Sequence, residues 1–102
     1  MKHYKVQLSP DAQDDLERLY DFLLGIDETV ALRAMDAIES SYRHLERAPF
    51  SCRKAADGEL GSRWRELLIN FGASGYEALF EIENDTTVTI TALRHQRESD
   101  YH

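Results

Sequence analysis

The spacing of hydrophobic and polar residues begins with the pattern of a strand followed by a helix. Residues 3–9, HYKVQLS, alternate hydrophobic and polar side chains, as in a strand with one buried face. Ser9-Pro10-Asp11 predicts a helix start, because Ser caps free N–H groups, Pro fits the first turn and Asp complements the helix dipole. Gly25 is the expected C-cap, and Ile26 is expected to pack just beyond it. The apolar stripe consists of Ala12, Leu16, Leu19, Leu23 and Ile26.

A second helix is predicted from Asp27 to about Arg47, ended by Pro49. Its inward stripe consists of Val30, Ala34, Ile38, Tyr42 and Leu45. The short connection between the helices predicts an antiparallel hairpin. Residues 49–63, PFSCRKAADGELGSR, show no clear period and are long for a connection in so small a domain, so we expect a functional or mobile segment.

Three strand patterns follow: WRELLINF (64–71), YEALFEIE (76–83) and TVTITALR (87–94). The turn sequences GASG and Asn84-Asp85 predict that these strands form an antiparallel meander. Alternation assigns one face to the helices: Leu67, Ile69, Phe71, Tyr76, Ala78, Phe80, Ile82, Val88, Ile90 and Ala92. The other, open face receives Trp64, Glu66, Leu68, Glu77, Leu79, Glu81, Glu83, Thr87, Thr89, Thr91 and Leu93. A β-bulge would reverse part of this assignment.

The predicted fold class is therefore α+β, with element order β-α-α-β-β-β in a single domain, residues 1–102. No apolar run approaches the roughly 20 residues of a membrane span, and the N-terminus lacks the apolar core of a secretory signal. With a single cysteine as well, the expected location is the cytoplasm. A net charge of −7 argues against non-specific binding of nucleic acid.

Cofactor and metal signatures are not expected from this sequence. It contains neither a GxxxxGK[ST] nor a GxGxxG loop for nucleotide phosphates. The acidic residues Asp14, Asp15 and Glu17 are explained by the dipole at the start of a helix, without a metal ion. We therefore expect neither a cofactor nor a metal.

The open face is predicted to carry an apolar patch rimmed by glutamates, made of Trp64, Leu68, Leu79 and Leu93. Such a patch on a small protein often marks a protein-binding site. The alternative is that these side chains are scattered, or are covered by residues 49–63.

The ending TALRHQRESDYH brings together residue types that catalyse phosphate chemistry. His95 and Tyr101 are candidates for an acid and a base, with Arg94 and Arg97 beside them as candidate cations for a charged transition state. Arg65, near the start of a neighbouring predicted strand, is a further candidate cation. A metal-independent ribonuclease needs this set. The alternative is an ordinary polar tail, which often contains Arg and His.

Three blocks of the chain, LSPDAQDDLERLYDFL, WRELLINFGASGYEALFEI and TALRHQRESDYH, resemble the ParE branch of the ParE/RelE toxin superfamily. These are the toxins of bacterial type II toxin–antitoxin modules, known also as plasmid-stabilisation proteins. The resemblance covers almost the whole chain and implies a helical hairpin packed on a small antiparallel sheet. RelE-like members are basic, ribosome-dependent mRNA endonucleases, whereas characterised ParE-like members inhibit DNA gyrase.

The nuclease residues of RelE-like toxins match this sequence only in part. Glu77 stands where such a toxin has an arginine after SGY, which reverses the charge, and the lysine pair before SGY has no counterpart. His95 falls at the position of the C-terminal arginine, and Tyr101 matches the terminal tyrosine. The resemblance therefore favours a toxin that acts by binding, with the His–Tyr ending keeping a ribonuclease as the alternative.

The leading hypothesis is a toxin that inhibits DNA gyrase and is neutralised by a small ParD-like antitoxin with a DNA-binding N-terminal half. The antitoxin's C-terminal tail is expected to lie along the helical hairpin and the open sheet face, with its basic residues meeting the acidic surface. Its expected apolar contacts are Trp64, Leu68, Leu79 and Leu93. The expected target-binding residues are Arg65, Arg94, His95, Arg97 and Tyr101.

Two alternatives remain open from the sequence. The first is a ribosome-dependent mRNA endonuclease that uses His95 and Tyr101, with Arg65 and Arg97 holding the phosphate. The second is an inactive relative that only binds an antitoxin, which would fail to arrest growth when expressed alone. Neither a membrane nor sequence-specific binding to nucleic acid is expected in any of the three.

Overall fold

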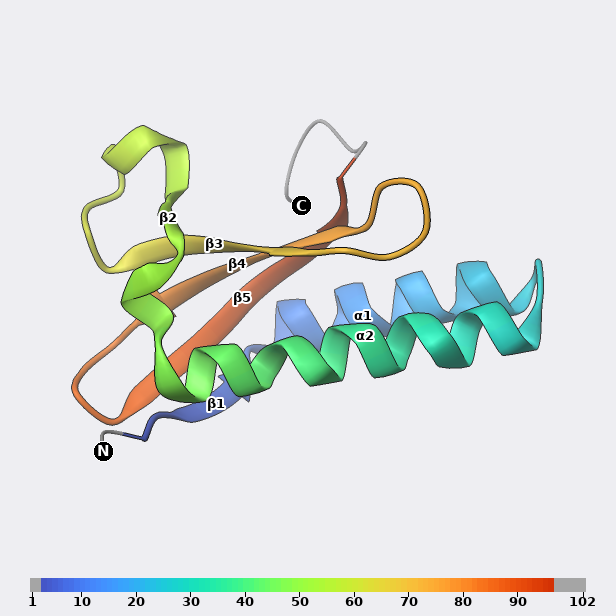
Figure 1. Ribbon diagram of the computed structural model, residues 1–102, viewed down its shortest axis with the longest axis horizontal. Helices are drawn as coiled ribbons and strands as arrows, with labels where there is room; N and C mark the ends of the chain where they lie inside the picture. Colours follow the sequence, from blue (N-terminus) through green and yellow to red (C-terminus); the bar gives the residue numbers. More distant parts are fainter. Residues whose placement is uncertain (1–2, 97–102) are drawn as a thin grey trace.

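The computed structural model describes residues 3–96, in which two helices pack across one face of a five-stranded sheet (Figure 1). The elements are β1 (Lys5–Leu8), α1 (Pro10–Leu24), α2 (Glu28–Arg47), β2 (Arg53–Lys54), β3 (Trp64–Ile69), β4 (Tyr76–Ile82) and β5 (Thr87–His95). Short 3-10 helices, Pro49–Ser51 and Ala55–Gly58, flank β2. The predicted α+β class and the order strand, helical hairpin, meander are confirmed.

Both helices begin at the capping residues that the sequence indicates. The Ser9 hydroxyl accepts a hydrogen bond from the Ala12 N–H (3.2 Å), and an Asp27 carboxylate oxygen accepts one from the Thr29 N–H (2.8 Å). Gly25 is the C-cap of α1, as predicted. The packing contact predicted for Ile26 is wrong: its side chain is 66% exposed, because the connection to α2 turns at the outer end of the hairpin (Figure 1).

The core lies between the hairpin and the helix-facing side of the sheet. Leu19 of α1 and Ile38 and Leu45 of α2 are buried there against the sheet residues Phe80 and Ile90. Other buried members of this cluster are Tyr4, Ala12, Ala34, Cys52, Ile69, Tyr76, Ala78, Ile82, Val88 and Leu93. Burial of these side chains is the main force that holds the helices on the sheet.

The sheet order is β1-β5-β4-β3-β2, so the meander is extended at both edges. The first strand runs parallel to β5, with Val6 opposite Val88, and the two-residue β2 pairs antiparallel with β3. The pairing of β2 was not predicted, since residues 49–63 show no clear period and were expected to be a functional or mobile segment. This segment therefore supplies both an edge strand and two short turns of 3-10 helix.

A β-bulge in β5 reverses the predicted faces beyond Thr91. Phe80 of β4 pairs with Ile90, but its neighbour Leu79 pairs with Ala92, which leaves Thr91 as an extra residue. The face predictions for Ala92 and Leu93 are therefore both wrong. Ala92 lies opposite the open-face residue Leu79, and Leu93, only 1% exposed, belongs to the core.

The bulge is stabilised by a buried carboxylate of α1. The Leu93 N–H donates a hydrogen bond of 2.9 Å to Asp15, whose side chain is itself buried. A carboxylate acceptor satisfies a backbone donor that has no neighbouring strand at this point, because β1 ends at Leu8. Asp15 was attributed to the helix dipole from the sequence alone, but the structure gives it this specific role.

Candidate functional site

The open face of the sheet carries a smaller apolar patch than the sequence predicts. Trp64 and Leu68 of β3 and Leu79 of β4 lie on it, since they alternate with the residues that enter the core. Leu68 is the most accessible, at 47% exposed, whereas Trp64 and Leu79 are half-buried. Leu93 is turned into the core by the bulge and does not join them.

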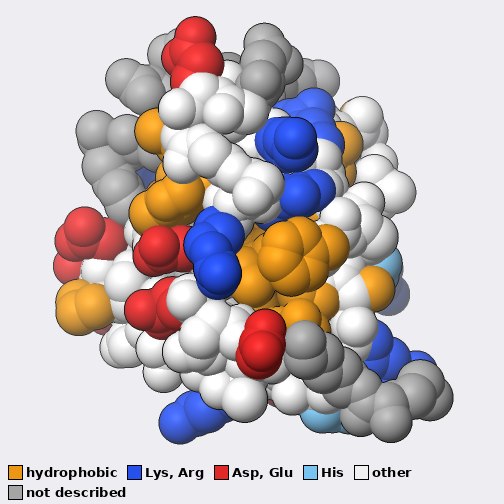
Figure 2. Space-filling model, turned by 90° about the vertical axis from the view of Figure 1, so that its left-hand side faces the viewer, with side chains coloured by type: hydrophobic (Ala, Val, Ile, Leu, Met, Phe, Trp, Pro, Cys, Tyr) orange, Lys and Arg blue, Asp and Glu red, His pale blue; other side chains and the backbone are white. Residues whose placement is uncertain are grey.

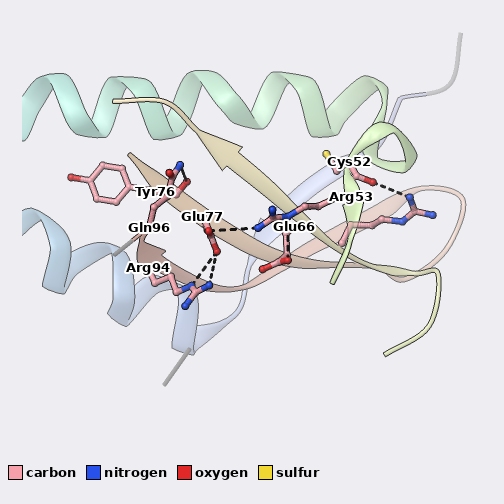
Figure 3. A network of polar contacts seen from close by, with 8 residues as sticks. Cys52, Arg53, Glu66, Tyr76, Glu77, Arg94 and Gln96 are labelled. Carbon is pink, nitrogen blue, oxygen red and sulfur yellow. Dashed lines mark hydrogen bonds and ion pairs between the residues drawn. The ribbon is translucent and has the colours of Figure 1, made fainter. Parts of the chain in front are cut away.

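Glu77 lies at the centre of an ion cluster that crosses this face from β2 to β5 (Figure 3). The Arg94 guanidinium donates two hydrogen bonds to Glu77 Oε2, from Nε at 3.1 Å and Nη2 at 2.7 Å. Arg53 lies 3.6 Å from the other Glu77 oxygen and 3.3 Å from Glu66. Glu77 is 7% exposed, so this carboxylate is buried and neutralised by two arginines.

The sequence could not indicate this cluster, because its members come from four strands. Glu77 meets Arg94 because the two residues are direct partners across β4 and β5, in the register that the bulge creates. Arg53 reaches them because β2 places it opposite Glu66 at the neighbouring edge. The open face therefore presents an internally paired set of charges in place of a row of cations.

Arg65 faces away from this cluster, toward the segment that follows α2. Its guanidinium donates hydrogen bonds to the carbonyls of Ser62 (2.7 Å), Phe50 (3.0 Å) and Cys52 (2.9 Å). It also lies over the Phe50 ring, 5.3 Å from the centroid. Arg65 thus fastens the 50–62 segment to β3. Figure 2 shows this end of the molecule, where hydrophobic side chains lie beside Lys and Arg side chains.

Cys52 lies within the 50–62 segment, and its side chain is buried in the core. Burial raises the pKa of its thiol, and the nearby Arg65 charge and a hydrogen bond with Ser51 oppose that shift only in part. A thiol with a raised pKa is a weak nucleophile at neutral pH. Cys52 is therefore a packing residue of this region.

His95 lies on the opposite side of the sheet from Arg94, at the end of β5. Its Nε2 is 3.1 Å from the Ser74 hydroxyl, and its ring meets the Tyr76 ring edge-on with centroids 5.5 Å apart. In the sheet, His95 pairs with Tyr76 and Arg65 pairs with Phe80. These two partners are four residues apart on β4, so His95 and Arg65 are separated by about 13 Å along the strand direction. The structure does not bring these two candidate catalytic residues together. Arg97 and Tyr101 lie outside the described residues.

A groove runs along the outside of the helical hairpin, starting at the free edge of β1. It consists of three adjoining hollows of about 590, 400 and 340 Å³ that share Glu39 and Tyr42 at one junction and Leu16 and Met35 at the next. Its end near β1 is acidic, lined by Asp36, Glu39 and Glu46 beside Arg43, and its middle is apolar, lined by Leu8, Leu16, Met35 and Ile38. We call this the hairpin groove.

Tyr42 is the unusual residue of the hairpin groove. Its hydroxyl is buried, and within residues 3–96 it has no hydrogen-bond partner. Burial, with a smaller contribution from the Glu39 charge, raises its pKa to about 12. A buried, unsatisfied hydroxyl costs about 1–3 kcal/mol. Tyr42 was assigned from the sequence only to the inward stripe of the second helix, and no sequence signal distinguishes it from a packing residue.

Residues 3–96 contain neither a candidate metal cluster nor a candidate membrane-spanning helix. No cluster of three or more His, Cys, Asp or Glu side chains within residues 3–96 is arranged to hold a metal ion. Neither helix in this part of the chain is long and apolar enough to cross a bilayer.

Comparison with known proteins agrees with this architecture. The family described as "ParE toxin of type II toxin-antitoxin system, parDE" matches residues 6–100. Toxin RelE3 of Caulobacter vibrioides is 35% identical over 97 residues, which cover 91% of this chain and 95% of that protein. A solved structure of the chromosomal ParDE system from P. aeruginosa superposes with a TM-score of 0.72 at 16% identity, covering 93% of this chain and 98% of the other. The chain therefore belongs to the ParE toxin family of type II toxin–antitoxin systems.

Proposed function

We propose that this toxin acts by binding DNA gyrase and inhibiting it, and that a small cognate antitoxin neutralises it in the cytoplasm. The observation that supports binding over RNA cleavage is the ion cluster on the open face. A phosphate-binding site needs cations with free donors, whereas Glu77 here engages both Arg53 and Arg94. The net charge of −7 acts in the same direction, since it repels a polyanion.

The ribonuclease alternative depends on His95 and Tyr101. It is weakened by the distance between His95 and Arg65 and by the three carbonyls that already occupy the Arg65 guanidinium. A nuclease would need its acid, its base and its cations around one phosphate. We therefore keep cleavage as the second candidate, with His95 as its testable residue.

The proposed target-binding surface lies where β5 ends. Arg94 reaches it from the open side of the sheet and His95 from the helix side, and the proposal adds Arg97 and Tyr101 from the residues that follow. Arg65 contributes to this surface indirectly, by holding the 50–62 segment against β3. A binding surface of this kind tolerates a single substitution with a modest loss, because most interface residues contribute little.

The proposed antitoxin contacts use two surfaces. On the open face they are Trp64, Leu68 and Leu79, without Leu93, which is committed to the core. On the other side of the molecule, the hairpin groove offers an apolar middle for hydrophobic side chains and an acidic end for basic ones. The Tyr42 hydroxyl is buried beside this groove, and a donor or acceptor from the antitoxin would satisfy it once the side chain turns toward the groove.

Replacing Tyr42 with Phe distinguishes an effect on antitoxin binding from an effect on the stability of the toxin. The free toxin should be as stable as wild type or slightly more so, because the substitution removes an unsatisfied polar atom. Antitoxin affinity should fall about 5- to 10-fold, the equivalent of one hydrogen bond. Calorimetric titration measures this loss, with Tyr20→Phe at the far end of the groove as the matched control. Unchanged affinity would remove Tyr42 from the antitoxin site.

Target identity is tested by comparing gyrase inhibition with RNA cleavage for the same protein. Inhibition of supercoiling, reversed by the antitoxin and reduced only a few-fold by His95→Ala, supports the proposal. Ribosome-dependent cleavage of mRNA that falls by about 100-fold or more in His95→Ala would instead establish the nuclease, because loss of a general acid or base has effects of that size. Absence of growth arrest without the antitoxin would favour the inactive relative.

A further inference from the structure

A second cavity lies on the sheet side of α1, apart from the hairpin groove. It has a volume of about 710 Å³ and is enclosed by one turn of the helix, the β3–β4 turn and the end of β5. Its lining consists of Arg18, Leu19, Phe22, Leu23, Phe71, Gly72, Ala73, Ser74, Tyr76 and His95. We call it the His95 pocket. Figure 1 shows the β3–β4 turn and α1 extending toward the same end of the molecule.

The walls of the His95 pocket are mainly apolar and include several aromatic rings. The Phe71 and Tyr76 rings are stacked with centroids 6.1 Å apart, and His95 meets Tyr76 edge-on. Phe22 also lines the pocket, although its side chain is largely exposed. Aromatic rings attract other flat rings by offset or edge-on contact, so this lining fits a planar aromatic group. The volume lies in the range of about 300–1,000 Å³ that is usual for small-molecule sites.

The pocket is preformed by a turn that has little freedom. Gly75 has φ +116°, and a Cβ atom there would lie 2.1 Å from the Ile69 carbonyl oxygen, so the turn folds tightly back on β3. The Gln96 N–H donates to the Gly75 carbonyl at 3.0 Å and ties the turn to the end of β5. A site that exists before binding avoids part of the ordering cost of association.

The charge of the described lining distinguishes this pocket from the three hollows of the hairpin groove. Each hollow of the hairpin groove is lined by at least one carboxylate, as expected for a chain of net charge −7. Among residues 3–96, the lining of the His95 pocket contains no carboxylate, and Arg18 is the cation in that described lining. The Arg18 side chain is 53% exposed and lies 4.0 Å from Asp15, which also accepts the Leu93 N–H. Ser74 and His95 add polar groups on the opposite wall.

We propose that the His95 pocket binds a small aromatic carboxylate. The ring lies against Phe71 and Tyr76, and the carboxylate is directed to Arg18, with the Ser74 hydroxyl within the same pocket. Binding of this ligand involves neither the proposed target nor the antitoxin, and it is measured on the toxin alone. Its failure would leave the proposed function untouched, and failure of the proposed function would not affect it.

The test compares three probes that share one ring system and differ in charge. Indole-3-acetate, indole and tryptamine are titrated into the full ¹⁵N-labelled chain, and amide shifts are followed by NMR. Indole-3-acetate should saturate with a dissociation constant of about 1 mM or below and shift the amides of Leu19, Ser74 and His95. Indole should bind more weakly, and tryptamine at least about 10-fold more weakly than the acid, since its ammonium group meets Arg18.

Two variants and one control locate the binding. Arg18→Gln should weaken indole-3-acetate about 5-fold and leave indole unchanged, because an exposed cation contributes about 1 kcal/mol. Ala73→Trp should fill the pocket and abolish binding of all three probes. Arg43→Gln, in the hairpin groove, is the matched control and should have no effect. The proposal is overturned by the absence of saturable shifts, by equal affinity for the three probes, or by shifts centred on the hairpin groove.

Discussion

Removing the carboxylate of Glu77 should strongly destabilise the protein, because it leaves a buried cation without its partner. Arg94 donates two hydrogen bonds to Glu77, and its side chain is only 16% exposed. Hydrogen bonds to charged groups contribute about 1.5–3 kcal/mol each, and the two here share one oxygen. Arg53 is 53% exposed, so its attraction adds less than about 1 kcal/mol. Glu77→Ala should therefore lower the free energy of unfolding by about 3 kcal/mol.

Urea unfolding followed by circular dichroism measures this loss directly. For a domain of this size, about 3 kcal/mol corresponds to a fall in Tm of roughly 12–24 °C. Glu77→Gln keeps one acceptor and should lose about half as much. Glu81→Gln, on the same strand and face, is the matched control and should change stability by less than about 0.5 kcal/mol. If Glu77→Ala unfolds within about 0.5 kcal/mol of wild type, the cluster does not hold the open face together and its arginines are available to a ligand.

Three further predictions follow from the burial of Leu93, Cys52 and Tyr42. Leu93→Ala should cost about 2–5 kcal/mol in urea unfolding and Leu68→Ala less than about 1 kcal/mol; similar losses would mean that the bulge does not reverse the face. Cys52 should react with iodoacetamide at pH 8 at least about 10-fold more slowly in the folded protein than in urea, and equal rates would contradict its burial. Burial raises the pKa of Tyr42 from 10.0 to about 12, so the unfolded chain loses this proton at a lower pH than the folded protein does. The free energy of unfolding is therefore unaffected by this group below pH 10 and falls as the pH rises from 10 toward 12. Tyr42→Phe should remove that part of the alkaline loss, and an unchanged alkaline stability profile would show that the Tyr42 hydroxyl is ionised equally easily in both states.

The sequence predicted the elements well, because their signals are local. Ser9 and Asp27 mark the helix starts by side-chain capping, and the alternation in 64–71 and 76–83 reflects one buried face. Alternation then failed in the last strand at Thr91, since one extra residue reverses every later side chain. The signal that was available is Asp15, a carboxylate that lies on the buried stripe of its helix between Ala12 and Leu19. A carboxylate there needs a donor from another element, and the bulged backbone supplies it.

The candidate site was harder to predict, because it depends on pairing between strands. The sequence placed Glu77 on the open face, where it reverses the charge of the arginine of RelE-like toxins, but it did not indicate the partners Arg94 and Arg53 that accompany its burial. Arg53 lies on β2, a strand of two residues that is too short to show a periodicity in the sequence. His95 was grouped with Arg65 by chemistry alone, and the register of β4 separates them. Residue type thus indicated the possible reactions, and only the register showed which residues meet.

The most direct test of the account is a supercoiling assay with purified gyrase, relaxed plasmid, ATP and this toxin, with and without its antitoxin. We expect loss of supercoiling or accumulation of linear plasmid as the toxin is added, and full recovery when the antitoxin is bound first. We also expect that His95→Ala retains inhibition within about 10-fold, as for one residue of an interface. Normal supercoiling at a large molar excess of toxin would contradict the gyrase proposal. Ribosome-dependent cleavage of mRNA would then be the activity to test.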